Sequence, residues 1–199
     1  MAVLRVRKHG TRMGDDFGRG DYLHDLRVLV SGVRVSIDEL AVPSSGEAAR
    51  EELRDRIDLI VELLRVLREL ERGVDDRVQV VDARALVWLA RSRHPHVFMG
   101  RMPAAVWVRT NVQAALELLD VVVSWVEASA GRVRIVAVPR PAALFVIGAP
   151  QDTSQASSPL DREMEQTIQS LAGAARVEAS LRESPRTAKL ELVSAGDEP

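Results

Sequence analysis

The sequence predicts an α+β protein in which a two-helix hairpin forms a dimeric four-helix bundle and is followed by an α/β sandwich. Between residues 21 and 71, apolar residues recur at steps of three and four, which is the spacing of one helix face. After Gly73 the pattern changes to short β-like runs between helical segments, which is typical of helices packed on a sheet. The composition is that of a globular chain, since 46% of its 199 residues are hydrophobic and 28% are charged.

Three parts are expected along the chain. Residues 1–20 end in a stretch rich in glycine and charge without any period, which predicts a flexible leader. Residues 21–73 are expected to form the helical hairpin, and residues 74–199 the α/β domain.

Composition also limits the compartment and the partners. The chain has no cysteine, which excludes a disulfide framework and fits a reducing compartment, so a cytoplasmic location is expected. Its longest apolar runs are far shorter than the ~20 residues of a membrane-spanning helix, so no membrane span is expected. A net charge of −2 predicts no general affinity for nucleic acid.

The first helix of the hairpin is expected to begin at Asp21, which can cap it, and to end near Leu40. Pro43 and the Ser-Gly pair that follows it break the helix, because proline lacks an amide proton and the pair favours a turn. The residues on its apolar stripe are Leu23, Leu26, Val30, Val33, Ile37 and Leu40.

The second helix is expected from Glu47 to Glu71, with Gly73 as its stop. Its apolar stripe consists of Leu53, Ile57, Ile60, Leu64 and Leu67, and it is widened by Leu59, Leu63, Val66 and Leu70. A lone antiparallel pair of helices cannot cover stripes of this width, and burying them calls for two more helices. We therefore expect a homodimer.

The remaining residues predict the elements of the sandwich. The expected strands are 77–81, 104–108, 132–138, 142–147, 176–180 and 189–193, and the expected helices are 82–93, 110–128 and 160–171. The strands on either side of the Pro139-Arg140-Pro141 turn should form a hairpin. His94-Pro95-His96 lacks a third ligand at a nearby spacing, so a loop is expected there rather than a metal site.

The run His24-Asp25-Leu26-Arg27 resembles the phosphoacceptor box of sensor histidine kinases, near the start of the first helix of their dimerisation hairpin. The similarity continues through residues 80–87, 116–120, 171–180 and 187–192, which match elements of the family's ATP-binding domain in order. It covers the chain from about residue 21 to residue 195. The resemblance implies a histidine-kinase-like α/β domain behind a phosphoacceptor hairpin.

The resemblance also implies three site residues. His24 would be the phosphoacceptor, since an imidazole with a pKa of about 6.5 offers a neutral, nucleophilic nitrogen at cellular pH. Asp25 would orient the ring or accept its proton, and Arg27 would contact phosphate oxygens or a neighbouring carboxylate. Because His24 lies beside the stripe residue Leu23 rather than on the stripe, we expect its ring to face solvent.

The histidine box departs from the family at two positions. Val28 and Leu29 stand where the family usually has Thr or Asn and then Pro. The resemblance implies that the missing polar residue makes phosphatase activity doubtful, and that the missing proline makes the first helix straighter.

The nucleotide site departs further. Val121 replaces the family's magnesium-binding Asn, and Gly148 is all that remains of its adenine-binding Asp-x-Gly-x-Gly turn. The bulky and acidic run 157–163 replaces the glycine-rich lid that cradles phosphates. Phosphoryl transfer from ATP depends on positioning and charge neutralisation, so the sequence predicts no ATP or magnesium cofactor.

Three functions remain open from the sequence. The first is a histidine phosphotransferase that passes phosphoryl between response-regulator receiver aspartates and His24 without ATP. The second is a diverged sensor histidine kinase that autophosphorylates His24 from ATP and magnesium. The third is a non-catalytic dimeric scaffold or regulator with a pseudokinase fold.

Overall fold

The structure is a computed structural model that describes residues 30–33, 35, 46–71, 77–100, 105–128, 130, 132–149, 161–183 and 186–196. Its helices are α2 (Glu47–Glu71), α3 (Ala83–Arg93), α4 (Val112–Glu127) and α5 (Arg162–Ala175). Its strands are β1 (Val78–Asp82), β2 (Val97–Met99), β3 (Trp107–Asn111), β4 (Val133–Pro139), β5 (Ala142–Gly148), β6 (Val177–Glu183) and β7 (Arg186–Ser194). In this described part of the chain, no helix has the length and apolarity needed to cross a membrane.

The strands form one seven-stranded mixed sheet in the order β1-β3-β7-β5-β4-β2, and β6 also pairs with β7. The pair β2–β4 is parallel, and the other pairs are antiparallel. The central strand is β7, whose residues 187–191 pair with β5 and whose residues 186–192 pair with β6. Its last residues, Val193 and Ser194, pair with β3, so β7 joins the antiparallel pair β1–β3 to the rest of the sheet.

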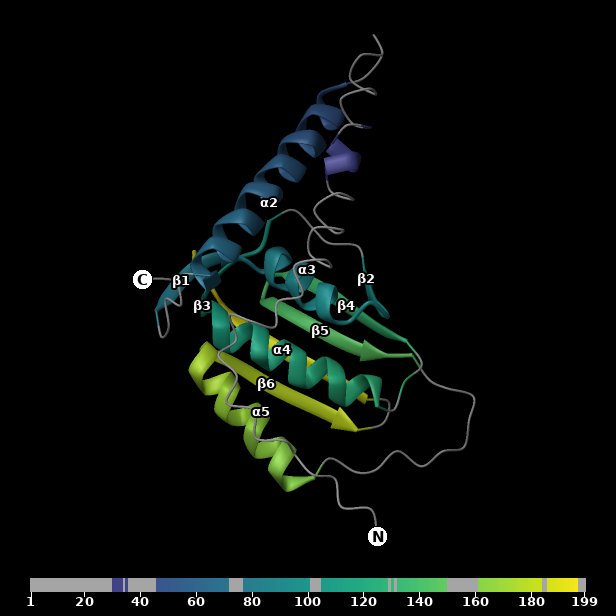
Figure 1. Ribbon diagram of the computed structural model, residues 1–199, viewed down its shortest axis with the longest axis vertical. Helices are drawn as coiled ribbons and strands as arrows, with labels where there is room; N and C mark the ends of the chain where they lie inside the picture. The colour runs from purple at the N-terminus through teal and green to yellow at the C-terminus, as the bar shows by residue number, and fades with distance from the viewer. Residues whose placement is uncertain are drawn as a thin grey trace.

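Helices α3, α4 and α5 cover one face of this sheet (Figure 1). Burial along β4 shows which face is inside, because Val133, Ile135 and Ala137 are buried while Arg134 is exposed. Helix α4 lies at the centre of this helical layer, between α3 and α5. The largest fully buried side chains include Leu86, Leu118, Leu119, Ile135, Leu144, Ile168 and Leu190.

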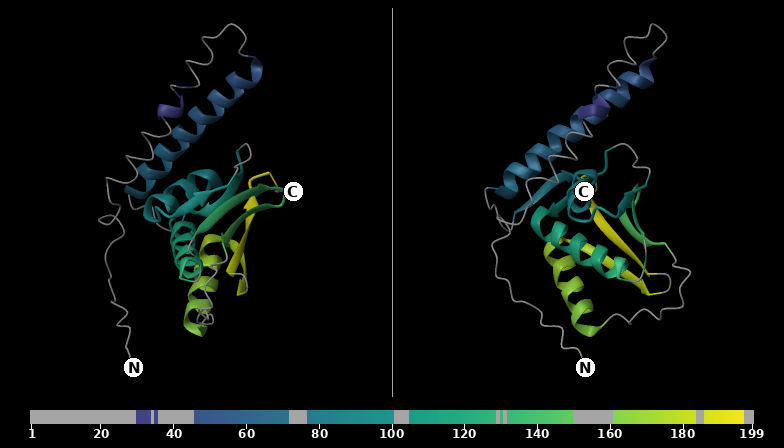
Figure 2. Two further views of the ribbon diagram at one scale, coloured as in Figure 1. Left: turned by 90° about the vertical axis from the view of Figure 1, so that its right-hand side faces the viewer. Right: turned by 45° about the vertical axis from the view of Figure 1, so that its right-hand side comes forward.

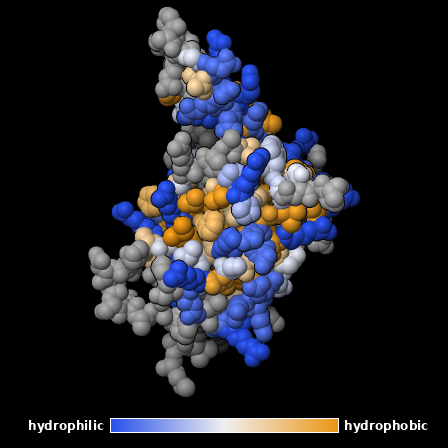
Figure 3. Space-filling model, turned by 180° about the vertical axis from the view of Figure 1, so that it is seen from behind, coloured by the Kyte–Doolittle hydropathy of each residue, from blue (hydrophilic) through white to orange (hydrophobic). Residues whose placement is uncertain are grey.

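The opposite face of the sheet carries exposed apolar side chains. Seen from behind, a hydrophobic band crosses the middle of the molecule (Figure 3). Val80 and Val193 both pair with Arg109, so they share one face with Trp107, two residues along β3. Within the described residues these three apolar side chains are among the most exposed of their kind.

Three helices begin at side chains that cap them, which explains where they start. The side chain of Asp82 accepts from the amide of Arg84, that of Asn111 from Ala114, and that of Asp161 from Met164. Arg176, in the left-handed conformation with a φ of 56°, ends α5 and turns the chain directly into β6.

Helix α2 belongs partly to the α/β core. Its residues Leu59, Leu63 and Val66 are buried in the same cluster as the residues between the sheet and its helices. Its first turns project beyond the α/β domain (Figure 2). The predicted domain boundary after residue 73 therefore follows a helix whose second half packs against the domain beyond that boundary.

The observed elements follow the predicted order, but several bounds differ. Strand β6 continues to Glu183 rather than ending at residue 180, and β7 begins at Arg186 rather than at residue 189. Strand β3 begins at Trp107 rather than at residue 104, because the preceding Val106 is bound through its backbone to the start of α3. Helix α5 continues to Ala175 rather than ending at Leu171, since Ala172 and Ala175 are buried against its neighbours. The short edge strand β2 was not predicted, because its ladder depends on β4, far along the chain.

Candidate functional site

The predicted site residues His24, Asp25 and Arg27 lie outside the described residues. The part of the first predicted helix that is described consists of residues 30–33 and 35, all of them helical. This segment lies beside α2, because Arg56 Nη1 donates a hydrogen bond of 2.9 Å to the carbonyl oxygen of Gly32. Two helical segments are therefore in contact at this point.

Helix α2 carries an exposed apolar stripe in addition to its buried one. Ile57 is 43% exposed, Val61 60% and Leu64 51%. Steps of four and three place these side chains on one face of the helix. On the facing segment, Val30 and Val35 are also each 55% exposed. A row of apolar side chains of this kind is a typical contact surface for another helix.

The opposite face of α2 is held to the α/β domain by a buried polar network. Arg84, the second residue of α3, is 3% exposed, and its neighbour Asp82 is 1% exposed. The guanidinium of Arg84 donates to both carboxylate oxygens of Asp55 on α2, at 2.6 and 2.8 Å. It also lies 2.7 Å from Asp82 Oδ2. Arg84 therefore links α2 to the cap of α3.

These contacts keep Arg84 charged despite its burial. Burial alone lowers the pKa of a guanidinium, but the hydrogen bonds to Asp55 and Asp82 outweigh that effect and the net shift of the Arg84 pKa is upward. The arrangement satisfies the requirement that a buried charge be paired and hydrogen-bonded.

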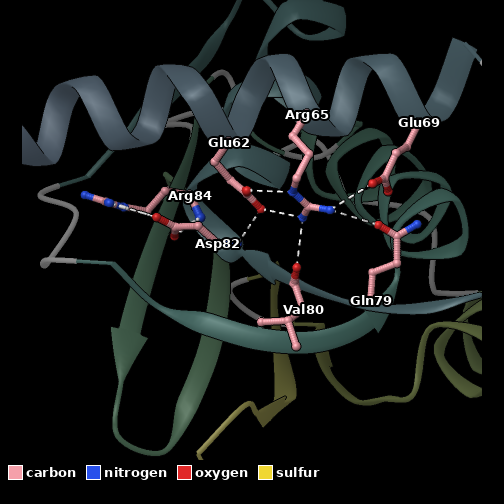
Figure 4. A network of polar contacts seen from close by, with 7 residues as sticks. All are labelled: Glu62, Arg65, Glu69, Gln79, Val80, Asp82 and Arg84. Carbon is pink, nitrogen blue, oxygen red and sulfur yellow. Dashed lines mark hydrogen bonds and ion pairs between the residues drawn. The ribbon is translucent and has the colours of Figure 1, made fainter.

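A second part of the network joins α2 to β1 (Figure 4). The buried carboxylate of Glu62 accepts two hydrogen bonds from Arg65, at 2.7 and 2.8 Å, and one from the amide of Asp82 at 3.2 Å. Arg65 also donates to the carbonyl of Val80 at 2.8 Å and to the Gln79 side chain at 3.2 Å. The hydrogen bond to Glu62 is the main reason that the pKa of Arg65 is raised.

The two parts of the network share Asp82, so the rotation of α2 about its axis is fixed relative to β1 and α3. No residue of the network was predicted as functional. The signal for Glu62 was its position within the widened apolar stripe, between Leu59 and Leu63, where a charged residue implies a buried partner. Arg84 gave no such signal, because its partner Asp55 lies 29 residues earlier in the chain.

A small open depression lies next to this network. Its described lining consists of Glu69, Leu70, Gln79, Val112 and Gln113. None of these lining residues is cationic, so the depression is unsuited to a phosphorylated ligand.

Positions that the resemblance assigns to nucleotide binding lie in apolar packing. Val121 is half-buried and packs against the core. A Cβ atom added to Gly148 would lie 2.8 Å from Ala130 Cβ and 3.0 Å from Val126 Cγ1, so the end of β5 is in close contact with the end of α4. Among the residues that the structure describes, no three His, Asp or Glu side chains are grouped to hold a metal ion. Residues 157–160 of the predicted lid lie outside the described part.

The structural neighbours of this chain include histidine kinases and a bacterial phosphotransferase. It is similar to Acinetobacter baumannii histidine kinase AdeS at 12% sequence identity and a TM-score of 0.48, over 87% of this chain and 98% of that one. It is similar to the cytoplasmic segment of histidine kinase QseC at 10% sequence identity and a TM-score of 0.41, over 67% of this chain and 93% of that one. It is similar to a bacterial phosphotransferase at 10% sequence identity and a TM-score of 0.38, over 86% of this chain and 91% of that one.

No protein-family model matches the sequence, and no curated protein matches it. At the TM-scores given above, the structural likenesses assign neither a family nor a function to this chain. The mixed α/β architecture is established by its own helices and strands.

Proposed function

We propose that the protein is a histidine phosphotransferase of a phosphorelay, with His24 as the phosphoacceptor and without use of ATP. The observations that carry the proposal are the phosphoacceptor-like sequence at residues 24–27, in the helix predicted before α2, and the apolar stripe that α2 exposes. A hairpin of this kind would present an imidazole on a dimeric bundle, within reach of a partner domain.

The exposed stripe supports a homodimer. Ile57, Val61 and Leu64 cannot pack on the α/β domain, because the opposite face of α2 is already bound there through Leu59, Leu63 and Val66. A second copy that offers the same stripe would complete a four-helix bundle and remove these side chains from water.

The proposed reaction exchanges one phosphate bond for another. A neutral ring nitrogen of His24 attacks the phosphorus of an aspartyl phosphate on a receiver domain, a nitrogen–phosphorus bond forms, and the aspartate carboxylate leaves. The reverse step on a second receiver regenerates His24. The receiver supplies both the acyl phosphate and its own magnesium. In this proposal Asp25 orients the imidazole and Arg27 contacts the phosphate oxygens or a carboxylate.

Two features support a reaction without ATP. Val121 stands at the position that would need a metal-binding amide, and Gly148 is packed against Ala130 rather than bordering an open site. In this proposal the α/β domain serves as a docking surface for the receiver. A kinase would instead require a nucleotide site built from other residues.

Labelled phosphoryl donors test the proposal. The protein is incubated separately with labelled ATP and with a phosphorylated receiver domain, and a His24→Ala variant serves as the control. We expect label from the receiver alone, and none on the variant. Label from ATP would favour the diverged kinase, and no label from either donor would favour the scaffold.

A further inference from the structure

The carboxyl ends of α3 and α4 meet at a single imidazole. His94 follows the last residue of α3, and its side chain, 12% exposed, lies between two carboxylates of α4. Its Nε2 is 2.8 Å from Asp120 Oδ1, and its Nδ1 is 3.1 Å from Glu127 Oε2. The two acids lie seven positions apart, which places them on one face of the helix. Each ring nitrogen therefore faces an acceptor.

Only the protonated ring can donate to both acids, because a neutral imidazole carries a single N–H. The hydrogen bond to Asp120 outweighs the partial burial of the ring and raises the pKa of His94. The same hydrogen bond is the main cause that lowers the pKa of Asp120. Since both nitrogens are engaged, the ring is not placed to act as a general base or a metal ligand.

The surroundings favour a cation at this place. A positive charge is stabilised at helix carboxyl ends, where the last carbonyl groups are unpaired. The other charged groups near these ends include Arg91 and Arg93 in the last turn of α3, with Arg93 3.9 Å from Asp120. They also include Arg186, which donates to the carbonyl of Trp125 at 2.8 Å. In the described residues, the strands in contact with α3 are β1, β2 and β4. Strand β2 contains no ionisable residue, and the inward residues of β4 are Val133, Ile135 and Ala137. Asp82 of β1 caps the opposite, amino end of α3.

We propose that His94 is a proton-operated clasp, which holds α3 to α4 while the imidazole is charged and releases Glu127 when the proton is lost. Glu127 has the longer of the two contacts, and its other oxygen, Oε1, is buried without a hydrogen-bond partner. When Nδ1 of His94 loses its proton, it can no longer donate a hydrogen bond to Glu127. The Glu127 carboxylate then turns toward solvent. The last turn of α4 then loosens. This inference does not depend on the proposed phosphotransfer.

The direction in which pH changes the folding stability follows from the pKa shifts of His94 and Asp120. The pKa of His94 is higher in the folded than in the unfolded chain, so its stabilisation is complete below the ordinary value of 6.5 and is lost as pH rises through the folded value. The pKa of Asp120 is lower in the folded chain, so its contribution is lost only as pH falls through that folded value. The clasp is therefore closed at mildly acidic pH and opens on the alkaline side.

The experiment compares the full chain with His94→Gln and with Glu117→Gln, a matched control on α4, the helix that carries Asp120 and Glu127. Glu117 accepts from Gln113 at 3.1 Å and belongs to a different contact. Chemical denaturation is measured between pH 6 and pH 9, and the His94 ring is titrated by NMR. Each unit between the folded and unfolded pKa corresponds to about a tenfold change in the folding equilibrium constant. We expect the wild type and Glu117→Gln to lose stability over this range, and His94→Gln to lose less.

Equal pH dependence of the wild type and His94→Gln would overturn the proposal. If His94→Gln does not fold, Asp120→Asn gives an independent readout, since it should move the NMR titration of His94 to lower pH. An unchanged titration in Asp120→Asn would also overturn it. Amide exchange at residues 124–127, corrected for the intrinsic rate at each pH, should accelerate as the ring deprotonates, and constant protection there would contradict the release of Glu127.

Discussion

Arg84 shows how much a single buried charge can determine in this chain. It is one of few charged residues of the described part that are almost fully buried, and it binds one acid of the helical hairpin and one of the α/β domain. A salt bridge of this kind is weak evidence for net stability, but the loss of one partner leaves an uncompensated buried charge. Its main effect is to permit a single orientation of α2.

Arg84→Met should therefore destabilise the protein by about 3–5 kcal/mol, since the carboxylate of Asp82 would stay buried without its partner. Chemical denaturation measures this change. Glu52→Gln is the matched control, because it breaks the exposed pair with Arg56 on the same helix and should cost less than about 1 kcal/mol. An equal loss of unfolding free energy in Arg84→Met and Glu52→Gln would contradict the importance of the buried Arg84 pairs for the position of α2.

Two glycines give opposite predictions for the same substitution. Gly148→Ala should destabilise by about 1–3 kcal/mol, since its new methyl group would overlap Ala130 and Val126. Gly173→Ala lies within α5 with nothing within 4 Å of the added atom, and should stabilise by about 0.5–1 kcal/mol. Thermal unfolding of both variants tests the pair, and a stable Gly148→Ala would contradict the close packing of β5 on α4.

Local features of single residues were the most predictable from the sequence. Asp82 was placed at the start of the following helix, and it caps that helix through its own side chain. The contacts of His94 were not predicted, because Asp120 and Glu127 are 26 and 33 residues away in the chain. His94-Pro95-His96 was expected to form a loop after the helix, and α3 does end at Arg93, yet His94 contacts both α3 and α4.

Among the elements, α2 was predicted with its observed bounds, because a long periodic stripe and a following glycine define a helix well. The sequence did not show that its two apolar faces have different partners. The face of Leu59, Leu63 and Val66 packs on the α/β core, and the face of Ile57, Val61 and Leu64 is exposed. Periodicity locates a stripe, but only the folded domain determines what covers it.

The exposed face of α2 gives a prediction about assembly. Val61→Glu should convert the expected dimer into a monomer, because it places a charge on the apolar stripe that the second copy would bury. Light scattering coupled to size exclusion measures the mass. Helix content should be unchanged, since Val61 is 60% exposed and makes little contact with the core. Glu51→Gln, an exposed change on the same helix, should leave the mass of the wild type unaltered, and a dimeric Val61→Glu would contradict the assignment of this face.

At the scale of the whole molecule, the order of helices and strands was largely predictable, since turns and alternation separate one element from the next. The sheet order was not, because it depends on β7, whose two edges pair with β5 and β6 and whose end pairs with β3. The predicted phosphoacceptor residues His24, Asp25 and Arg27 remain predictions.

The predicted lack of a nucleotide site concerns the whole domain, and it can be tested directly. Addition of ATP and magnesium should leave the melting temperature unchanged. A ligand at a hundredfold excess over its dissociation constant would stabilise the folded chain by about 2.7 kcal/mol, which is a readily measured shift. A clear rise in melting temperature would contradict the proposed phosphotransferase and favour the kinase.

The double role of α2 has a mechanical consequence. Because its exposed stripe and its core residues are opposite sides of one rigid rod, any twist or tilt imposed on the rod where it projects must be carried into the sheet at its other end. Helix α2 contains no glycine or proline from Glu47 to Glu71, so it has no residue at which a kink would be expected to absorb such a movement. A displacement of the projecting turns of α2 would therefore move the residues of its second half that pack on the α/β domain.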